Sequence, residues 1–123
     1  MDQKKILIAD DNENIREALT YLLEDEGYQL RLAKDGADTL QQVKEFRPDI
    51  ILLDIMMPEI NGYDVCRAVK SDPSLQKTYV IMLTAKGQVA EQERGKEVGA
   101  DEYVVKPFSP MDILSKIKHV LDA

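Results

Sequence analysis

The chain contains a single cysteine, Cys66, among its 123 residues. A lone cysteine excludes an internal disulfide, so the fold does not depend on the cross-links that stabilise many small secreted domains. This absence fits a reducing compartment, and we expect the protein to be cytoplasmic. The residues around Cys66 favour a small core side chain over a reactive thiol.

Long hydrophobic runs and an excess of positive charge are also missing. The longest apolar runs, such as Tyr79–Leu83, are far shorter than the roughly 20 residues that cross a bilayer as a helix. The amino-terminal residues lack the apolar region of a signal peptide. Lysine and arginine number 16 against 23 aspartates and glutamates, which gives a net charge of −7. We therefore expect no direct binding to nucleic acid or to a membrane.

What the chain does have is a series of short apolar blocks, each followed by a helical pattern. Five blocks have the length and composition of strands: Ile6–Ala9, Tyr28–Ala33, Ile50–Leu53, Tyr79–Leu83 and Tyr103–Val105. The second block alternates polar and apolar residues, as a half-exposed strand does. The first, third and fourth are apolar throughout, which is typical of strands buried on both faces.

Helical spacing of apolar residues fills the segments between the blocks. Helices are predicted from Asn12 to Gly27, from Gly36 to about Phe46, from Gly62, over Val89–Val98 and from Ser109. Asn12 is expected to cap the first helix and Gly27 to end it. The helix Val89–Val98 is the weakest of these, because it has few apolar anchors and contains Gly95.

This alternation of strands and helices predicts an α/β fold, in which a parallel sheet is covered by helices on both faces. The half-exposed second strand is expected at an edge of the sheet. That position agrees with a doubly wound, flavodoxin-like (βα)5 arrangement with strand order 2-1-3-4-5. The chain has no internal repeats or linkers and its length suits one core, so residues 1–123 are expected to form one domain.

Polar residues stand where the strands end. Asp10 and Asp11 follow the first strand, Asp54 ends the third, Thr84 the fourth and Lys106 the fifth. In a parallel sheet these ends lie on one edge, where ligands bind in open α/β folds. We therefore expect three carboxylates, one hydroxyl and one ammonium to converge there.

This combination of groups favours phosphoryl chemistry with a metal ion. Neighbouring carboxylates repel one another and are costly without a cation, and hard oxygen ligands suit Mg²⁺, which also binds phosphate oxygens. Lys106 and Thr84 can pair with a phosphoryl group, and an aspartate can be the nucleophile that accepts it. Each residue alone has an ordinary structural explanation, as a turn former, a cap or a solvated lysine. Because all five of these residues coincide with strand ends, a functional explanation is favoured over a structural one.

The sequence resembles the receiver domain of bacterial two-component response regulators. The resemblance extends from near Lys5 to near Leu121. The matching segments are Ile6–Asp11, Asp49–Asp54, Met57–Pro58, Asn61–Gly62, Thr84–Ala85, Gly99–Asp101 and Lys106–Phe108. This resemblance implies a phospho-accepting signalling switch, which catalyses only its own phosphorylation and dephosphorylation. It also implies a sensor histidine kinase or a histidine phosphotransfer protein as the phosphoryl donor.

The same resemblance implies a role for each site residue. Asp54 would accept the phosphoryl group. Asp11, Asp54 and the backbone carbonyl of Met56 would bind Mg²⁺ directly, and Asp10 would act mainly through water. Lys106 would pair with the phosphoryl oxygens.

The resemblance further implies a conformational switch. Thr84 would move to the phosphoryl group and Tyr103 would turn inward behind it, and the peptide bond before Pro107 is expected to be cis. An ordinary half-buried aromatic is the alternative for Tyr103. The helix Val89–Val98, the strand at Tyr103 and the last helix would form a face that dimerises or binds an effector. Candidate contacts there, each of which could equally be a solvated charge, are Arg94, Lys96, Asp101, Glu102 and Lys116.

Two other functions are alternatives for a chain of this fold class. A flavodoxin-type FMN carrier needs a loop rich in Gly, Ser and Thr after the first strand, whereas Asp10 and Asp11 repel phosphate unless a metal intervenes. An aspartyl-phosphate phosphohydrolase needs a second carboxylate two residues after its nucleophile, where this chain has Met56. We therefore expect neither activity. Met56 and Lys86, each two residues past a site residue, instead predict slow loss of the phosphoryl group.

Overall fold

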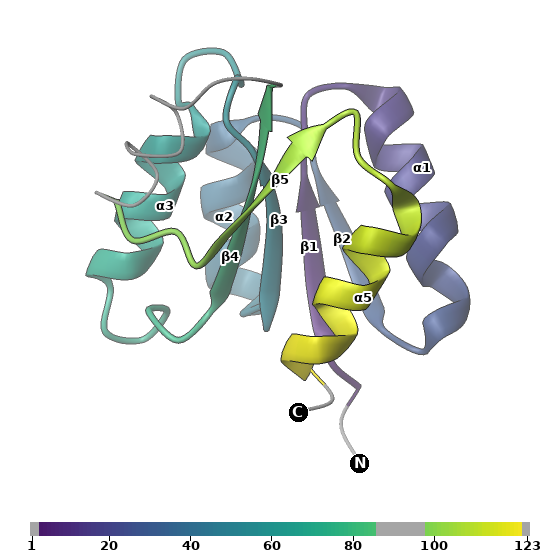
Figure 1. The fold of residues 1–123 in the computed structure, drawn as a ribbon. Helices are drawn as coiled ribbons and strands as arrows, with labels where there is room; N and C mark the ends of the chain where they lie inside the picture. The colour runs from purple at the N-terminus through teal and green to yellow at the C-terminus, as the bar shows by residue number, and fades with distance from the viewer. Residues whose placement is uncertain (1–2, 86–97, 122–123) are drawn as a thin grey trace.

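The structure is a computed structural model that describes residues 3–85 and 98–121. Its centre is a sheet of five strands: β1 (Lys5–Ala9), β2 (Gln29–Ala33), β3 (Ile50–Asp54), β4 (Tyr79–Ala85) and β5 (Glu102–Lys106). Neighbouring strands pair in parallel, in the order β2-β1-β3-β4-β5 (Figure 1). This arrangement confirms the predicted α/β fold and its flavodoxin-like strand order.

The described α-helices lie on both faces of the sheet, and a short 3-10 helix, η1 (Glu24–Glu26), follows the first of them. The α-helices are α1 (Glu13–Leu23), α2 (Gly36–Phe46), α3 (Gly62–Ser71) and α5 (Pro110–Leu121). In Figure 1, α1 and α5 lie on one face and α2 and α3 on the other. The predicted helix Val89–Val98 falls outside the described residues, except for Val98 itself. Among the described helices, none has the length and apolar character needed to cross a bilayer.

Short polar side chains determine where three of the helices begin. As predicted, Asn12 caps α1: its side chain accepts hydrogen bonds from the backbone N–H groups of Asn14 and Ile15, at 2.8 and 3.3 Å. Asp35 and Asn61 cap α2 and α3 in the same way. Because the first N–H groups of a helix have no partner within it, each cap stabilises its helix by about 1 kcal/mol. The caps also hold the loops that follow β1, β2 and β3.

Two hydrophobic cores lie on opposite faces of the sheet, because side chains alternate between the faces along each strand. One core joins the sheet to α2 and α3 and includes Leu7, Ile51, Leu53, Val69 and Met82. The other joins it to α1 and α5 and includes Ile8, Leu19, Leu52, Ile81 and Ile117. The strands β1, β3 and β4 are therefore buried on both faces, as their apolar blocks predict.

Cys66 lies in the core between the sheet and α3, with its side chain fully buried. The thiol donates a long hydrogen bond to the backbone carbonyl of Val98, with 3.5 Å between sulfur and oxygen. Burial raises the pKa of the thiol to about 11, so the thiolate that reacts with electrophiles is scarce at neutral pH. The structure thus agrees with a small core residue at this position.

Two helices begin so close to neighbouring backbone that only glycine fits. A Cβ atom at Gly62, the first residue of α3, would collide with the carbonyl oxygen of Asp54 and the Cα of Ile55. A Cβ atom at Gly36, the first residue of α2, would collide with the carbonyl oxygen of Ile60. The starts of α2 and α3 therefore pack directly on the end of β3 and the loop after it, and restrict where Asp54 can lie.

We predict that Gly62→Ala destabilises the protein by about 1–3 kcal/mol, the usual cost of overpacking a close contact. In an ordinary helix the same change stabilises by about 0.5–1 kcal/mol, so the sign of the effect is diagnostic. Urea unfolding measures it. Arg67→Ala, an exposed position on the same helix, should change stability by less than about 0.5 kcal/mol. An unchanged or more stable Gly62→Ala variant would contradict the close contact.

Candidate functional site

Asp10 lies at the carboxyl end of β1, where this strand separates from β2. Its backbone N–H donates to the carbonyl of Ala33 at 3.1 Å, the last bond of that ladder. Its carboxylate is fully buried and accepts hydrogen bonds from the backbone N–H of Asn12 at 2.9 Å and from Lys106 Nζ at 3.0 Å. Both carboxylate oxygens are therefore paired, as a buried charge requires. Asp11, the next residue, is exposed.

Asp54 is the last residue of β3 and is only 4% exposed. Its Oδ1 accepts a hydrogen bond from Lys106 Nζ at 3.1 Å and a longer one from the backbone N–H of Met56 at 3.4 Å. Burial, and after it the negative charge of Asp10, raise the pKa of Asp54 to about 6, although Lys106 opposes the shift. Ionisation of Asp54 therefore costs free energy in the folded protein, and an additional cation nearby would lower that cost.

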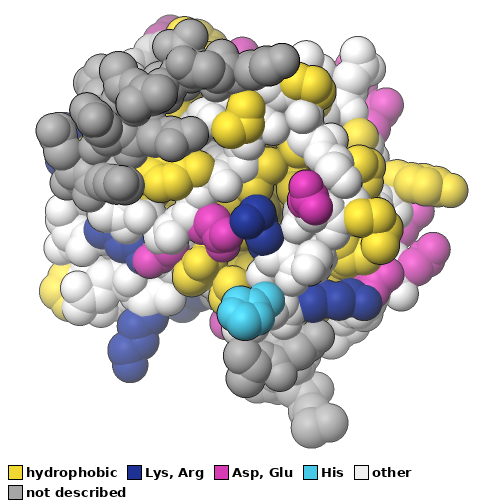
Figure 2. Space-filling view, in the orientation of Figure 1, with side chains coloured by type: hydrophobic (Ala, Val, Ile, Leu, Met, Phe, Trp, Pro, Cys, Tyr) yellow, Lys and Arg dark blue, Asp and Glu magenta, His cyan; other side chains and the backbone are white. Residues whose placement is uncertain are grey.

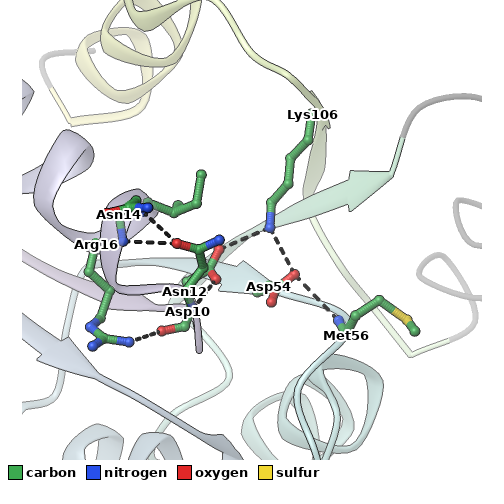
Figure 3. Close-up of polar contacts among 8 residues, drawn as sticks. Asp10, Asn12, Asn14, Arg16, Asp54, Met56 and Lys106 are labelled. Atoms are coloured by element: carbon green, nitrogen blue, oxygen red, sulfur yellow. Dashed lines mark hydrogen bonds and ion pairs between the residues drawn. The ribbon is translucent and has the colours of Figure 1, made fainter.

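Lys106, at the end of β5, bridges the two buried carboxylates (Figure 3). Burial opposes the charge on its ammonium, but the hydrogen bond to Asp10 and the charges of Asp54 and Asp10 outweigh it and raise its pKa. Lys106 is thus fixed as a cation between β1 and β3. Its peptide bond to Pro107 is cis, as expected.

The three carboxylates surround one position. Ligand oxygens of Asp10, Asp11 and Asp54 lie within 4.8 Å of one another, beside a cavity of about 480 Å³ that Asn12, Ile15, Met56, Lys106 and Pro107 also line. Three carboxylates against one ammonium leave an excess of negative charge on oxygen atoms, which is the donor set that Mg²⁺ prefers. These residues fit a magnesium ion.

Thr84 and Tyr103 lie away from this cavity. Thr84 is buried in β4, one strand from Asp54, and Tyr103 is half-buried in β5. Within the described residues, neither hydroxyl has a hydrogen-bond partner, although both are buried. A buried hydroxyl without a partner costs about 1–3 kcal/mol, and such groups in native structures call for an explanation. The structure therefore brings Asp10, Asp11, Asp54 and Lys106 together, with Thr84 near the end of the neighbouring strand β4.

Arg16 lies near the site, and its contact there was not predicted from the sequence. It lies in the second turn of α1, and its Nη1 donates a hydrogen bond of 2.7 Å to the backbone carbonyl of Asp10 (Figure 3). No signal in the sequence indicates this contact, because an arginine in an amphipathic helix ordinarily belongs to the solvated face.

The other predicted residues have separate surroundings. The Met56 side chain is 69% exposed at the rim of the cavity. Asp101 pairs with Lys70 and Glu102 with Lys116, each at 2.7 Å, so these three predicted contact residues, Asp101, Glu102 and Lys116, already have partners within the chain. Arg94, Lys96 and Lys86 lie outside the described residues.

Comparison with known proteins agrees with this arrangement. The family model described as response regulator receiver domain matches residues 6–118. The chain is 40% identical over 116 residues to the DNA-binding response regulator MtrA of Mycolicibacterium smegmatis, covering 94% of this chain and 50% of MtrA. It thus spans about half the length of this curated relative.

Two solved structures extend the comparison. A response regulator from Chloroflexus aurantiacus superimposes with a TM-score of 0.92 at 34% identity, covering 99% of this chain and 100% of that one. The BeF3-activated receiver domain of DrrB, from Thermotoga maritima, gives 0.89 at 32% identity, covering 99% of this chain and all of that one. From the family match and this fold, the chain belongs to the response regulator receiver domains.

Proposed function

We propose that this receiver domain works in a two-component phosphorelay, with Asp54 taking a phosphoryl group from a sensor histidine kinase or a histidine phosphotransfer protein. The observation that carries this proposal is the placement of Asp54 at a cavity, bonded to Lys106 within a cluster of three carboxylates. A carrier of FMN or a phosphohydrolase is not favoured in a chain of this family. The chain acts as a signalling domain whose only catalysis is on its own aspartate.

In the proposed transfer, a carboxylate oxygen of Asp54 attacks phosphorus, a new O–P bond forms, and the P–N bond to the donor imidazole breaks. The imidazole leaves with the electron pair of that bond. Lys106 Nζ, 3.1 Å from Asp54 Oδ1, stands where it can neutralise the incoming phosphoryl oxygens. Asp11, Asp54 and the backbone carbonyl of Met56 would hold Mg²⁺ directly, and Asp10 would act mainly through water. The ion would supply further positive charge to those oxygens.

The switch that we propose uses the two hydroxyls that lack partners among the described residues. A phosphoryl oxygen on Asp54 would offer Thr84 the acceptor that its buried hydroxyl lacks. Movement of Thr84 would open space behind it, into which Tyr103 turns. The free energy gained when the Thr84 hydroxyl acquires a hydrogen-bond partner would couple phosphorylation to a change at β5.

The partner surface that we propose includes β5 and α5, which lie at the front in Figure 1. Figure 2 presents this side, where hydrophobic side chains lie among charges of both signs. Val105, in β5, is 37% exposed, and the pair of Lys116 with Glu102 can exchange for pairs with another protein. A second copy of the chain or an effector is the proposed partner, in the cytoplasm. DNA binding is stated of MtrA; for this stretch, with its negative net charge, we keep the prediction of no direct contact with nucleic acid.

Acetyl phosphate with Mg²⁺ should phosphorylate Asp54 alone. Both carboxylate oxygens of Asp10 accept hydrogen bonds, whereas those of Asp54 both go to Oδ1, so among the described residues Oδ2 of Asp54 is left without a donor. Intact mass spectrometry should record a gain of one phosphoryl group, and Asp54→Asn should abolish it. Asp25→Asn, which removes an exposed carboxylate beyond the end of α1, should label normally. Labelling that survives in Asp54→Asn would show that another carboxylate is the acceptor.

In metal-free protein, Asp54→Asn should gain stability relative to the wild type as pH rises from about 4 to 6. The pKa of Asp54 is raised from 3.8 to about 6 in the folded protein, so ionisation of this carboxyl group destabilises the fold. The wild type therefore loses stability as pH rises through this range, and the loss of stability is complete above about pH 6. We expect a difference of about 1–3 kcal/mol at pH 7, and Mg²⁺ should reduce it. Urea unfolding in a chelator across this pH range measures the difference.

The control for this experiment is Arg67→Ala, an exposed substitution on α3 that changes no carboxylate, so its stability relative to the wild type should stay constant in that window. A constant difference between Asp54→Asn and the wild type from pH 4 to 7 would show that the folded protein does not resist ionisation of Asp54.

The aspartyl phosphate should be comparatively long-lived, because the thioether of Met56 at the cavity rim offers no strong hydrogen bond to hold an attacking water. Met56→Asn combined with Lys86→Glu should speed its decay up to about tenfold, the effect of one positioned hydrogen bond. The decay of phosphorylated protein in Mg²⁺, without kinase, measures this. Met111→Asn, at an equally exposed methionine on α5, is the matched control. Equal or slower decay in the double variant refutes the idea.

A further inference from the structure

The carbonyl of Asp10, the residue that follows β1, accepts its hydrogen bond from a side chain and not from a neighbouring strand. The ladder between β1 and β2 stops at Ala33, which accepts from the Asp10 N–H. Beyond it the chain turns into α2, and in this parallel register the next N–H that could donate to the Asp10 carbonyl is that of Asp35. Among the described residues no such backbone bond forms. Arg16 supplies a donor from α1, at 2.7 Å.

We propose that Arg16 is a positioning residue for the metal site, which acts by holding the peptide group between Asp10 and Asp11. This inference rests on the proposed function, because it assumes that Asp11 binds Mg²⁺. Arg16 does not line the cavity beside the three carboxylates, so it acts through the backbone and not on the ion.

The planarity of the peptide bond connects Arg16 to Asp11. The carbonyl of Asp10 and the backbone nitrogen of Asp11 belong to one rigid plane, so a bond that fixes the carbonyl also fixes the direction in which Asp11 leaves the turn. Asp10 is already held by Ala33, Asn12 and Lys106. Asp11 differs, because its exposed carboxylate has no hydrogen bond within the described part of the chain. The direction of the Asp11 side chain therefore depends on the backbone conformation.

The charge of Arg16 and its positioning role have opposite effects on metal binding. A guanidinium near three carboxylates repels a cation, so its removal would tighten Mg²⁺ binding if charge were its only influence. Loss of the bond to Asp10 would let Asp11 leave the geometry in which its oxygen lies near those of Asp10 and Asp54, and binding would weaken. A purely structural bond would lower stability and leave affinity unchanged. The sign of the affinity change therefore separates the three explanations.

Isothermal titration of Mg²⁺ into the wild type, Arg16→Met and Arg16→Lys tests the proposal. We expect Arg16→Met to bind three- to tenfold more weakly although it removes a positive charge, and Arg16→Lys, which keeps a donor, to lie between it and the wild type. Arg67→Met removes an equal charge from the exposed side of α3 and should leave affinity unchanged or slightly tighter. Unchanged or tighter binding by Arg16→Met overturns the proposal.

A double-mutant cycle with Asp11 supplies a second, independent test. If Arg16 acts through Asp11, Arg16→Met should have little effect on affinity in an Asp11→Asn background. An effect of equal size in both backgrounds overturns the proposal even if binding weakens. Arg16→Lys replaces Arg16→Met in the cycle if the latter does not fold, as judged by its thermal transition.

The same series separates this inference from the function on which it rests. If the wild type and Asp11→Asn bind Mg²⁺ equally, the assigned metal site is wrong, and the positioning role is wrong with it. If Asp11→Asn weakens binding and Arg16→Met does not, the metal site stands and only the role of Arg16 is overturned.

Discussion

Two buried carboxylates held by one ammonium are the interaction on which the rest of this structure depends. Asp10, Lys106 and Asp54 come from three different strands, and the two hydrogen bonds between them are 3.0 and 3.1 Å long. Either carboxylate alone would be costly in this position, because a buried charge without a partner loses its hydration. The register of the parallel sheet brings the three strand ends together, and the starts of α2 and α3, packed on the loop after β3 and on the end of β3, restrict where Asp54 can lie.

This arrangement leaves the protein short of its most stable state. The charge balance among the site residues is negative, the pKa of Asp54 is raised to about 6, and two buried hydroxyls lack partners among the described residues. A sequence selected for stability alone would replace such groups with apolar ones of similar shape. The carboxylates and Lys106 lie together at the carboxyl edge of the sheet, and their excess of negative charge fits a site that a cation would stabilise.

Much of the fold and of the site could be predicted from the sequence, because the patterns that indicate them lie within short segments. Ile6–Ala9 and Ile50–Leu53 are apolar without interruption, so their burial and the polar residues at their ends can both be read from short segments. The contact of Arg16 with Asp10 could not, because it depends on where β2 turns away from β1. The need for glycine at position 62 is also a tertiary effect, since the obstructing atoms belong to β3. Thr84 lies near the end of the predicted strand, yet only the structure shows that its hydroxyl is buried and has no partner among the described residues.

The burial of Cys66 has a consequence for observing the protein in solution. The chain has no other cysteine, and this thiol is sealed between α3 and the backbone at Val98. A thiol-specific reagent can reach it only when that contact separates, so the rate of modification reports local opening of the domain on the side of α3. The modification rate of Cys66 can therefore measure local opening of the domain without an engineered label.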